Sequence, residues 1–276
     1  MKFDMNKVWS HAVELIGDNF QLLATIAAVF LLLPTVAIYM LIPDFATMMA
    51  PGTDPEVLAA QMEEFIGPLI GIGLVGMVFQ FAGYGAMVAL MGSGRPTVGQ
   101  ALGAGFKMVP SLIIATLLFA LIYFVGAFLI SLPFSFLAVA AESVLVTFIA
   151  VIFVLVFVVY LMARFSLIMP VMAFEETLNP FIAISRSFKL TGPSHWRIFA
   201  FWGVLLVLYV VAALLLGGVF GVVAALAAEG VVAALILGLT NGAMATAVGM
   251  VACALVAAMH IQLAGPGDAE ISETFE

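Results

Sequence analysis

Residues 164–197 read RFSLIMPVMAFEETLNPFIAISRSFKLTGPSHWR, and this stretch is polar and basic where the sequence on both sides of it is apolar. It contains half of the eight Lys and Arg residues in the chain, namely Arg164, Arg186, Lys189 and Arg197. A basic segment between two long apolar runs is typical of a loop between membrane-spanning helices. The stretch therefore predicts a polytopic membrane protein.

A short helix is predicted in the middle of this stretch, over residues 179–190. Asn179 is a favourable N-cap, and Pro180 suits the first helical position because its missing N–H would have no partner there. Gly192-Pro193 predicts the end of the helix, with Gly192 in the left-handed conformation.

The predicted helix has two different faces. Phe181, Ile184 and Phe188 fall on one face, whereas Ser185, Arg186 and Lys189 fall on the other. One interpretation is a helix on the membrane surface, with its rings at the acyl boundary and its cations among anionic headgroups. The alternative is a linker helix that packs on the protein's own helix ends, with its cations in water.

The composition of the chain also indicates a membrane protein. Hydrophobic residues make up 65% of the sequence and charged residues 9%, and the mean hydropathy is +1.28. A soluble domain is about half apolar and about a quarter charged. Cys253 is the single cysteine, and the three histidines, His11, His195 and His260, are scattered. We therefore expect no disulfide, metal or cofactor, and no nucleic-acid partner.

Six apolar runs are long enough to cross a bilayer, which takes about 20 residues. Because backbone groups in hydrocarbon must pair within their own segment, these runs are predicted to be helices. We expect an all-α fold with one domain over 1–264 and an acidic, disordered tail over 265–276. A short interfacial helix is expected to begin at Asp54-Pro55. The predicted spans lie near 20–42, 68–91, 109–131, 142–163, 198–222 and 234–262.

The charges predict the orientation of these spans. With six spans, all eight cations fall on one side, because the remaining four are Lys2, Lys7, Arg95 and Lys107. The opposite loop over 43–67 carries acidic residues and no cation. The positive-inside rule then predicts that both termini are cytoplasmic.

An internal repeat divides the chain further. Ala101 to Lys107 and Ala183 to Lys189 share the pattern Ala-x4-Phe-Lys, at an offset of 82 residues (183 − 101). Each copy precedes a predicted span after a break that contains Pro110 or Pro193, and an amphipathic segment over 4–18 precedes the first span. The chain is thus predicted to contain three units, each an amphipathic helix followed by a transmembrane hairpin.

The residues of the central stretch also resemble a known family. Arg164 to Pro170, Glu175-Glu176, Ala183 to Gly192 and Trp196-Arg197 together resemble the membrane domain of bacterial glycerophosphoryl diester phosphodiesterases, a pattern also found in free-standing six-helix bacterial membrane proteins. The resemblance implies a six-helix module in a bacterial inner membrane. It does not imply hydrolysis, because the separate catalytic barrel of those enzymes, with its metal-binding His and carboxylate residues, has no counterpart in this sequence.

Small and polar residues within the spans have two interpretations. Gly71-x-Gly73-x-x-Gly76 and the series from Gly238 to Ala257 predict close helix packing, in preference to a dinucleotide site for the first. Gln80, Tyr84 and Asn241 are candidate intramembrane polar groups, which either pack helices or line a pathway.

The sequence favours a non-catalytic membrane module. We expect it to engage anionic lipid, or a membrane protein partner or second copy, through the cytoplasmic cations. The candidate residues for this contact are Arg164, Arg186, Lys189, His195, Trp196 and Arg197. The alternative is a transporter or flippase of a small or lipidic substrate.

Overall fold

The structure is a computed structural model that describes residues 3–42, 55–92, 94, 96–226 and 230–265, and most of these residues are helical. Six segments in this part of the chain are helical, long and apolar enough to cross a membrane, which confirms the predicted all-α membrane fold with six such helices. They are Met5–Leu41, Ile70–Leu90, Val98–Ala140, Val144–Phe174, Pro180–Val223 and Val231–Ala264.

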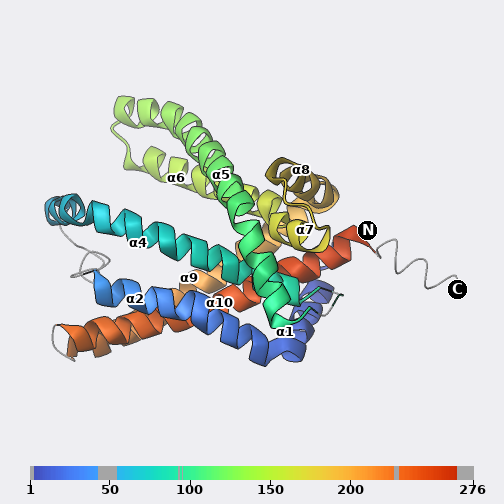
Figure 1. Cartoon of the computed structure of the whole chain (residues 1–276). Helices are drawn as coiled ribbons and strands as arrows, with labels where there is room; N and C mark the ends of the chain where they lie inside the picture. Colours follow the sequence, from blue (N-terminus) through green and yellow to red (C-terminus); the bar gives the residue numbers. More distant parts are fainter. Residues whose placement is uncertain (1–2, 43–54, 93, 95, 227–229, 266–276) are drawn as a thin grey trace, which may run out of the picture. The chain divides into compact units, whose positions relative to one another are not determined.

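Figure 1 shows the order of the helices along the chain. In chain order they are α1 (Met5–Ala27), the π-helical η1 (Ala28–Leu32), α2 (Leu33–Leu41), α4 (Pro55–Leu90), α5 (Val98–Ala140), α6 (Val144–Phe165), α7 (Ile168–Phe174), α8 (Pro180–Thr191), the 3₁₀ turn η2 (Gly192–Ser194), α9 (His195–Leu226) and α10 (Val231–Ala264).

Several helices are longer than the predicted spans. The segment expected to be a separate interfacial helix at Pro55 is the start of α4, and the amphipathic segment over 4–18 belongs to α1. A hydropathy criterion marks only the length that a bilayer requires, whereas a helix continues until a residue stops it. The tail predicted over 265–276 lies outside the described residues except for Gly265.

Prolines within the helices have different effects. The π-helical turn η1 lies directly before Pro34, where a wider turn accommodates a residue that cannot donate a backbone hydrogen bond. Pro110 was predicted to break the chain, but α5 runs through both Pro110 and Pro133. Pro193 does lie in a break, the 3₁₀ turn between α8 and α9.

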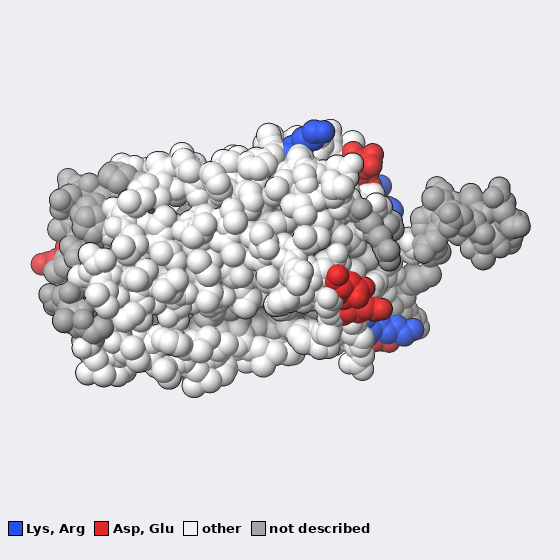
Figure 2. All heavy atoms as spheres, turned by 60° about the horizontal axis from the view of Figure 1, so that its bottom comes forward, with Lys and Arg blue, Asp and Glu red and all other residues white. Residues whose placement is uncertain are grey.

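The described residues belong to two compact units. Unit 1 comprises Met1–His11, Pro110–Val207 and Val256–Glu276, and unit 2 comprises Ala12–Val109 and Leu208–Leu255. Much of the large apolar surface of both units is exposed, as at Phe136, Leu214 and Leu226. The face drawn in Figure 2 accordingly has broad areas without Lys, Arg, Asp or Glu, as expected of surfaces that contact lipid.

Glycines determine the closest helix contacts of unit 2. The three atoms nearest to a Cβ added to Gly105 of α5 are all backbone atoms of α4, at Ala82 and Ala86. In α10, the same addition at Gly242 would meet Leu32, and at Gly249 it would meet Leu31 and the ring of Tyr84. The small residues of α10 therefore form the predicted packing seam.

The glycines of the first predicted seam behave differently. A Cβ added to Gly71, Gly73 or Gly76 would have no neighbour within 4 Å, so the predicted close packing is not found there among the described residues. Gly71 and Gly76 instead line an apolar groove of about 370 Å³ between α2 and α4, two helices that lie side by side in Figure 1.

In unit 1, α5 and α6 form a hairpin with a tight turn. Glu142 adopts a positive φ of 46°. Ser143 N–H donates to the carbonyl of Ala138 at 3.1 Å, and Glu142 N–H donates to that of Val139 at 3.4 Å, which is the Schellman pattern that closes a helix end. Along the hairpin, the ring of Phe157 on α6 occupies the space beside Gly126 on α5.

Candidate functional site

The central basic stretch folds into α7, α8 and η2, and α8 forms as its sequence predicts. Asn179 Oδ1 accepts hydrogen bonds from the backbone N–H groups of Phe181 and Ile182, at 3.0 and 3.3 Å. The helix ends at Thr191, as expected, but Gly192 has right-handed helical angles (φ −53°, ψ −53°). The left-handed cap predicted for Gly192 is therefore wrong, because the chain continues through the 3₁₀ turn η2 into α9 without reversing.

The inner face of α8 packs on the end of α6 through Ser187, which is fully buried. Its hydroxyl donates to the carbonyl oxygen of Arg164 at 2.7 Å and accepts from the backbone N–H of Leu167 at 3.3 Å. These two backbone groups lie at the break between α6 and α7. Groups at helix ends have no partner within their own helix, so Ser187 supplies one. Ser187 thus joins α8 to the break between α6 and α7.

Arg164 lies against the same helix. Its guanidinium carbon is 4.4 Å from the centre of the Phe188 ring, and its Nη1 donates to Thr191 Oγ1 at 2.9 Å. Its Nε is buried and has no hydrogen-bond partner among the described residues. Phe188 also packs edge-on against Phe165, with ring centroids 5.3 Å apart. Arg164 is therefore a cation held against the protein, with its guanidinium over an aromatic ring.

Glu175 links three parts of unit 1. Both of its carboxylate oxygens accept from Arg186 Nε, at 3.0 and 3.1 Å. Oε1 also lies 3.0 Å from Nε2 of His260 on α10, whose side chain is only 6% exposed. Because a carboxylate can only accept, Nε2 carries the hydrogen in this contact. Glu175 therefore connects the end of α7 to α8 and to α10.

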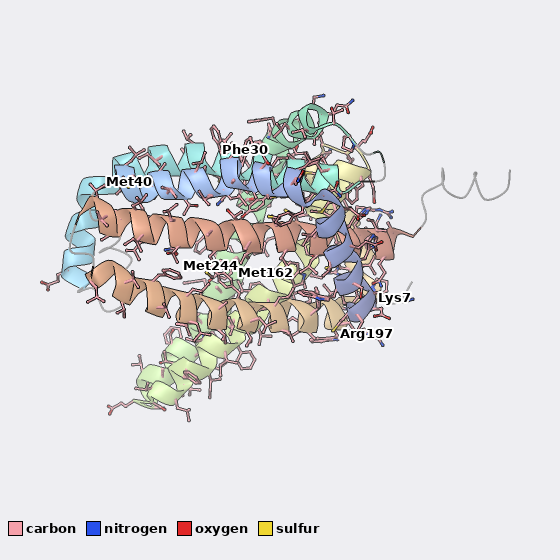
Figure 3. The ribbon with its side chains drawn as sticks, turned by 90° about the horizontal axis from the view of Figure 1, so that it is seen from below. Lys7, Phe30, Met40, Met162, Arg197 and Met244 are labelled. Atoms are coloured by element: carbon pink, nitrogen blue, oxygen red, sulfur yellow. The ribbon has the colours of Figure 1, made fainter. Side chains whose placement is uncertain are left out.

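Phe3 and Asp4 are held by side chains of η2, α9 and α10. Phe3 N–H donates to Ser194 Oγ at 3.2 Å, and Arg197 Nη1 donates to the carbonyl of Phe3 at 3.2 Å. Asp4 N–H donates to Gln262 Oε1 at 3.0 Å. Figure 3 labels Lys7 and Arg197 in the first turns of α1 and α9. Arg197 thus has an intramolecular role, as has His195, whose Nδ1 lies 2.7 Å from the carbonyl of Gly192.

The outward face of α8 combines apolar and basic side chains. The predicted division into an aromatic and a basic face is therefore wrong, because Phe181 is exposed with Lys189 whereas Phe188 packs on Arg164 and Phe165. Phe181 and Ile182 are 64% and 55% exposed. Lys189 is exposed on the same helix and makes no hydrogen bond or ion pair with any described residue. Trp196, at the start of α9, is 67% exposed. We call Phe181, Ile182, Lys189 and Trp196 the outward surface.

The three candidate intramembrane polar groups, Gln80, Tyr84 and Asn241, lie in different environments. Asn241 is exposed, and its amide donates to the carbonyl of Leu237 in its own helix at 2.9 Å. Tyr84 packs on Gly249, and Gln80 is partly buried. None of the three lines the α2–α4 groove or the cavity of about 250 Å³ between α5 and α6.

Sequence reasoning identified part of this site. It named Arg164, Arg186 and Arg197 as candidates, but it treated His260 as isolated and did not consider Ser187 or the contacts of Phe3 and Asp4. The N-terminal contacts join residues more than 190 positions apart, and no sequence pattern indicates them. Ser187 had a signal: it occupies the position of Gly105 in the internal repeat.

Comparison of the chain with protein-family models, with curated proteins and with solved structures finds no match. The resemblance of the central stretch to the phosphodiesterase membrane domain therefore stays an expectation, and a function must be argued from the geometry of the site.

Proposed function

We propose that this protein is a non-catalytic integral membrane module that binds anionic lipid through the outward surface of α8 and the start of α9. Lys189 is the cation that contacts the headgroup. Phe181, Ile182 and Trp196 lie at the acyl boundary beside it. In this proposal both termini lie on the cytoplasmic side of the inner membrane, with α8.

The observation that carries the proposal is the separation of roles among the cations. Arg164 is paired with Phe188 and Thr191, Arg186 with Glu175, and Arg197 with the backbone of Phe3. Lys189 is left exposed on a helix face that also exposes Phe181 and Ile182. A polar helix face in water gains nothing from exposed Phe and Ile side chains, whereas a helix in the interface buries them in the acyl boundary.

Lipid is a better ligand than a soluble anion for this surface. Exposed Trp side chains are enriched at the membrane–water interface, because the ring is apolar and the indole N–H is polar. A soluble anion would use Lys189 but would leave Phe181 and Ile182 in water. An anionic phospholipid satisfies the cation and the apolar side chains together.

The transporter or flippase alternative has less support. A pathway needs polar groups that face one cavity, and Asn241 instead bonds to its own helix while Tyr84 packs on Gly249. Enzymatic activity has no positive support either. The carboxylate of Glu175 contacts His260 and also pairs with Arg186, so it holds the end of α7 to α8 and α10.

Native mass spectrometry of the detergent-purified protein tests the proposal, with phosphatidylglycerol and phosphatidylcholine as competing probes. We expect the protein to retain phosphatidylglycerol selectively. Lys189→Gln should weaken this binding about fivefold, because one basic residue near an anionic surface contributes about 1 kcal/mol. Lys189→Arg should bind like the wild type.

The effect should decrease at high salt, since exposed charges are screened within about 8 Å at physiological ionic strength. Equal retention of phosphatidylglycerol by folded wild type and Lys189→Gln would contradict the proposal.

A further inference from the structure

The internal repeat found in the sequence is also seen in where two helices of the structure begin. Helix α5 begins at Val98 and α8 begins at Pro180, at the same offset of 82 residues as the sequence repeat. The two N-caps, Thr97 and Asn179, have this offset too. Thr97 forms a capping box with Gln100, whose backbone N–H donates to Thr97 Oγ1 while its side-chain Oε1 accepts from Thr97 N–H at 2.9 Å.

The same faces of the two helices are buried. Position by position, the burial of residues 98–105 matches that of 180–187. Ala101 and Ala183, the first residues of the repeated pattern, are both fully buried. Lys107 and Lys189, the last residues of the pattern, are both exposed.

The contacts of the two helices are equivalent as well. Gly105 lies against the backbone of α4 at Ala82 and Gly85, and Ser187 bonds to the backbone at Arg164 and Leu167. Ala82, Gly85 and Gly105 in the first crossing therefore correspond to Arg164, Leu167 and Ser187, each 82 residues later. A repeat that holds in the caps, the burial and the contacts is structural, so the two helices cross the ends of their preceding helices in the same way.

The start of α1 has the same pattern, with Asp4 at the position of the N-cap Asn179. Asp4 Oδ1 accepts from the N–H groups two and three residues later, at 3.0 and 3.1 Å, as Asn179 does. Val8 and Ala12 are buried, at the positions of Ala183 and Ser187. In this third copy the position of Lys189 is occupied by Glu14, which is also exposed.

We propose that Lys107 marks a second anionic-headgroup site, equivalent to the one at Lys189, and that the chain therefore binds two anionic phospholipids at repeated positions. The inference rests on the proposed function of the outward surface. The apolar side chains beside the two cations differ: Gly99 and Gln100 occupy the positions of Phe181 and Ile182, and Ile114, which is 42% exposed, occupies that of Trp196. Phe106, which precedes Lys107, is 46% exposed and adds an apolar side chain there. The third copy is not a site, because Glu14 repels an anionic headgroup.

Titration with phosphatidylglycerol in native mass spectrometry tests the inference on the full chain. Lys107→Gln and Lys189→Gln should each weaken one of the two binding events about fivefold in Kd and leave the other unchanged. The double variant should bind more weakly at both sites. Lys7→Gln is the matched control, since Lys7 is exposed on α1 but lies outside the repeated position, and it should bind like the wild type.

Glu14→Lys provides a gain-of-function test, because it places a cation in the third copy of the register and should add a third binding event. Soluble glycerol 3-phosphate should compete weakly if the ligand is a whole lipid, and strongly if the sites recognise the phosphate alone.

The possible outcomes separate the two proposals. Loss in Lys189→Gln without loss in folded Lys107→Gln would overturn the second site and leave the proposed function intact. Equal binding in wild type and both single variants would overturn both. A loss in Lys7→Gln as large as in Lys107→Gln would show a diffuse charge effect and would also overturn the repeated sites.

Discussion

The crossing of α4 and α5 can be tested at two glycines on one helix turn, Gly105 and Gly103. An added Cβ at Gly105 would meet three backbone atoms of α4, one of which is the amide nitrogen of Ala86 at 2.8 Å. Backbone atoms cannot rotate away, so the two helices must separate. At Gly103 the same Cβ would have no neighbour within 4 Å.

Both Ala substitutions gain stability from the higher helix propensity of Ala, but only Gly105→Ala loses stability through overpacking. Gly→Ala in a helix stabilises by about 0.5–1 kcal/mol. Overpacking costs about 1–3 kcal/mol. Gly103→Ala should therefore stabilise the protein slightly, whereas Gly105→Ala should be less stable than Gly103→Ala by about 1–3 kcal/mol. The difference between the variants isolates the cost of the helix contact.

The single cysteine provides the assay. Cys253 is buried, and its thiol lies 3.8 Å from the carbonyl of Tyr84 in the same unit. A thiol-reactive fluorophore should thus label it only on unfolding, during a thermal ramp in detergent. We expect the midpoint of Gly105→Ala to lie below that of Gly103→Ala by about 2–4 °C for each kcal/mol. Equal midpoints for the two variants would refute the close crossing of α4 and α5.

Three further substitutions test unit 1 in a thermal ramp in detergent, with the loss of helix measured by circular dichroism. Ser187→Ala should destabilise by about 1–3 kcal/mol, because it leaves the buried N–H of Leu167 without a partner, while Ser185→Ala, on the exposed face of α8, should be neutral; a neutral Ser187→Ala would refute the anchoring role. Gly126→Ala should destabilise the α5–α6 hairpin by overlap with the Phe157 ring, and adding Phe157→Leu should recover part of the loss. Glu175→Gln should cost less than about 1 kcal/mol, because Arg186 is 42% exposed and the pair is screened by water, and a cost above about 3 kcal/mol would contradict this.

Local chemistry explains which parts of the fold could be predicted. The six spans follow from long apolar runs, and the start of α8 follows from Asn179-Pro180, because both depend on residues adjacent in sequence. The conformation of Gly192 was not predictable in this way. Whether a glycine reverses the chain or continues it depends on where the next helix lies, and here η2 leads directly into α9.

The contacts between distant residues explain the rest. The seam at Gly242 and Gly249 was predicted and found, whereas Gly71 and Gly76 have the same small size but no neighbour to pack against. Small residues permit close approach without requiring it. The roles of the cations were likewise hidden, since the sequence shows four basic residues in one stretch but not that Arg164 stacks on Phe188 while Lys189 remains exposed.

The position of α8 relative to the bilayer is the most direct test of the account. A spin label at residue 181, in a Cys253→Ala background, can be measured by power saturation in phosphatidylglycerol-containing bilayers with oxygen and with a water-soluble nickel chelate as relaxation agents. The account predicts that oxygen relaxes the label more effectively than the chelate, because Phe181 lies at the acyl boundary. Dominant relaxation by the nickel chelate would place this face of α8 in water and contradict the proposed lipid contact.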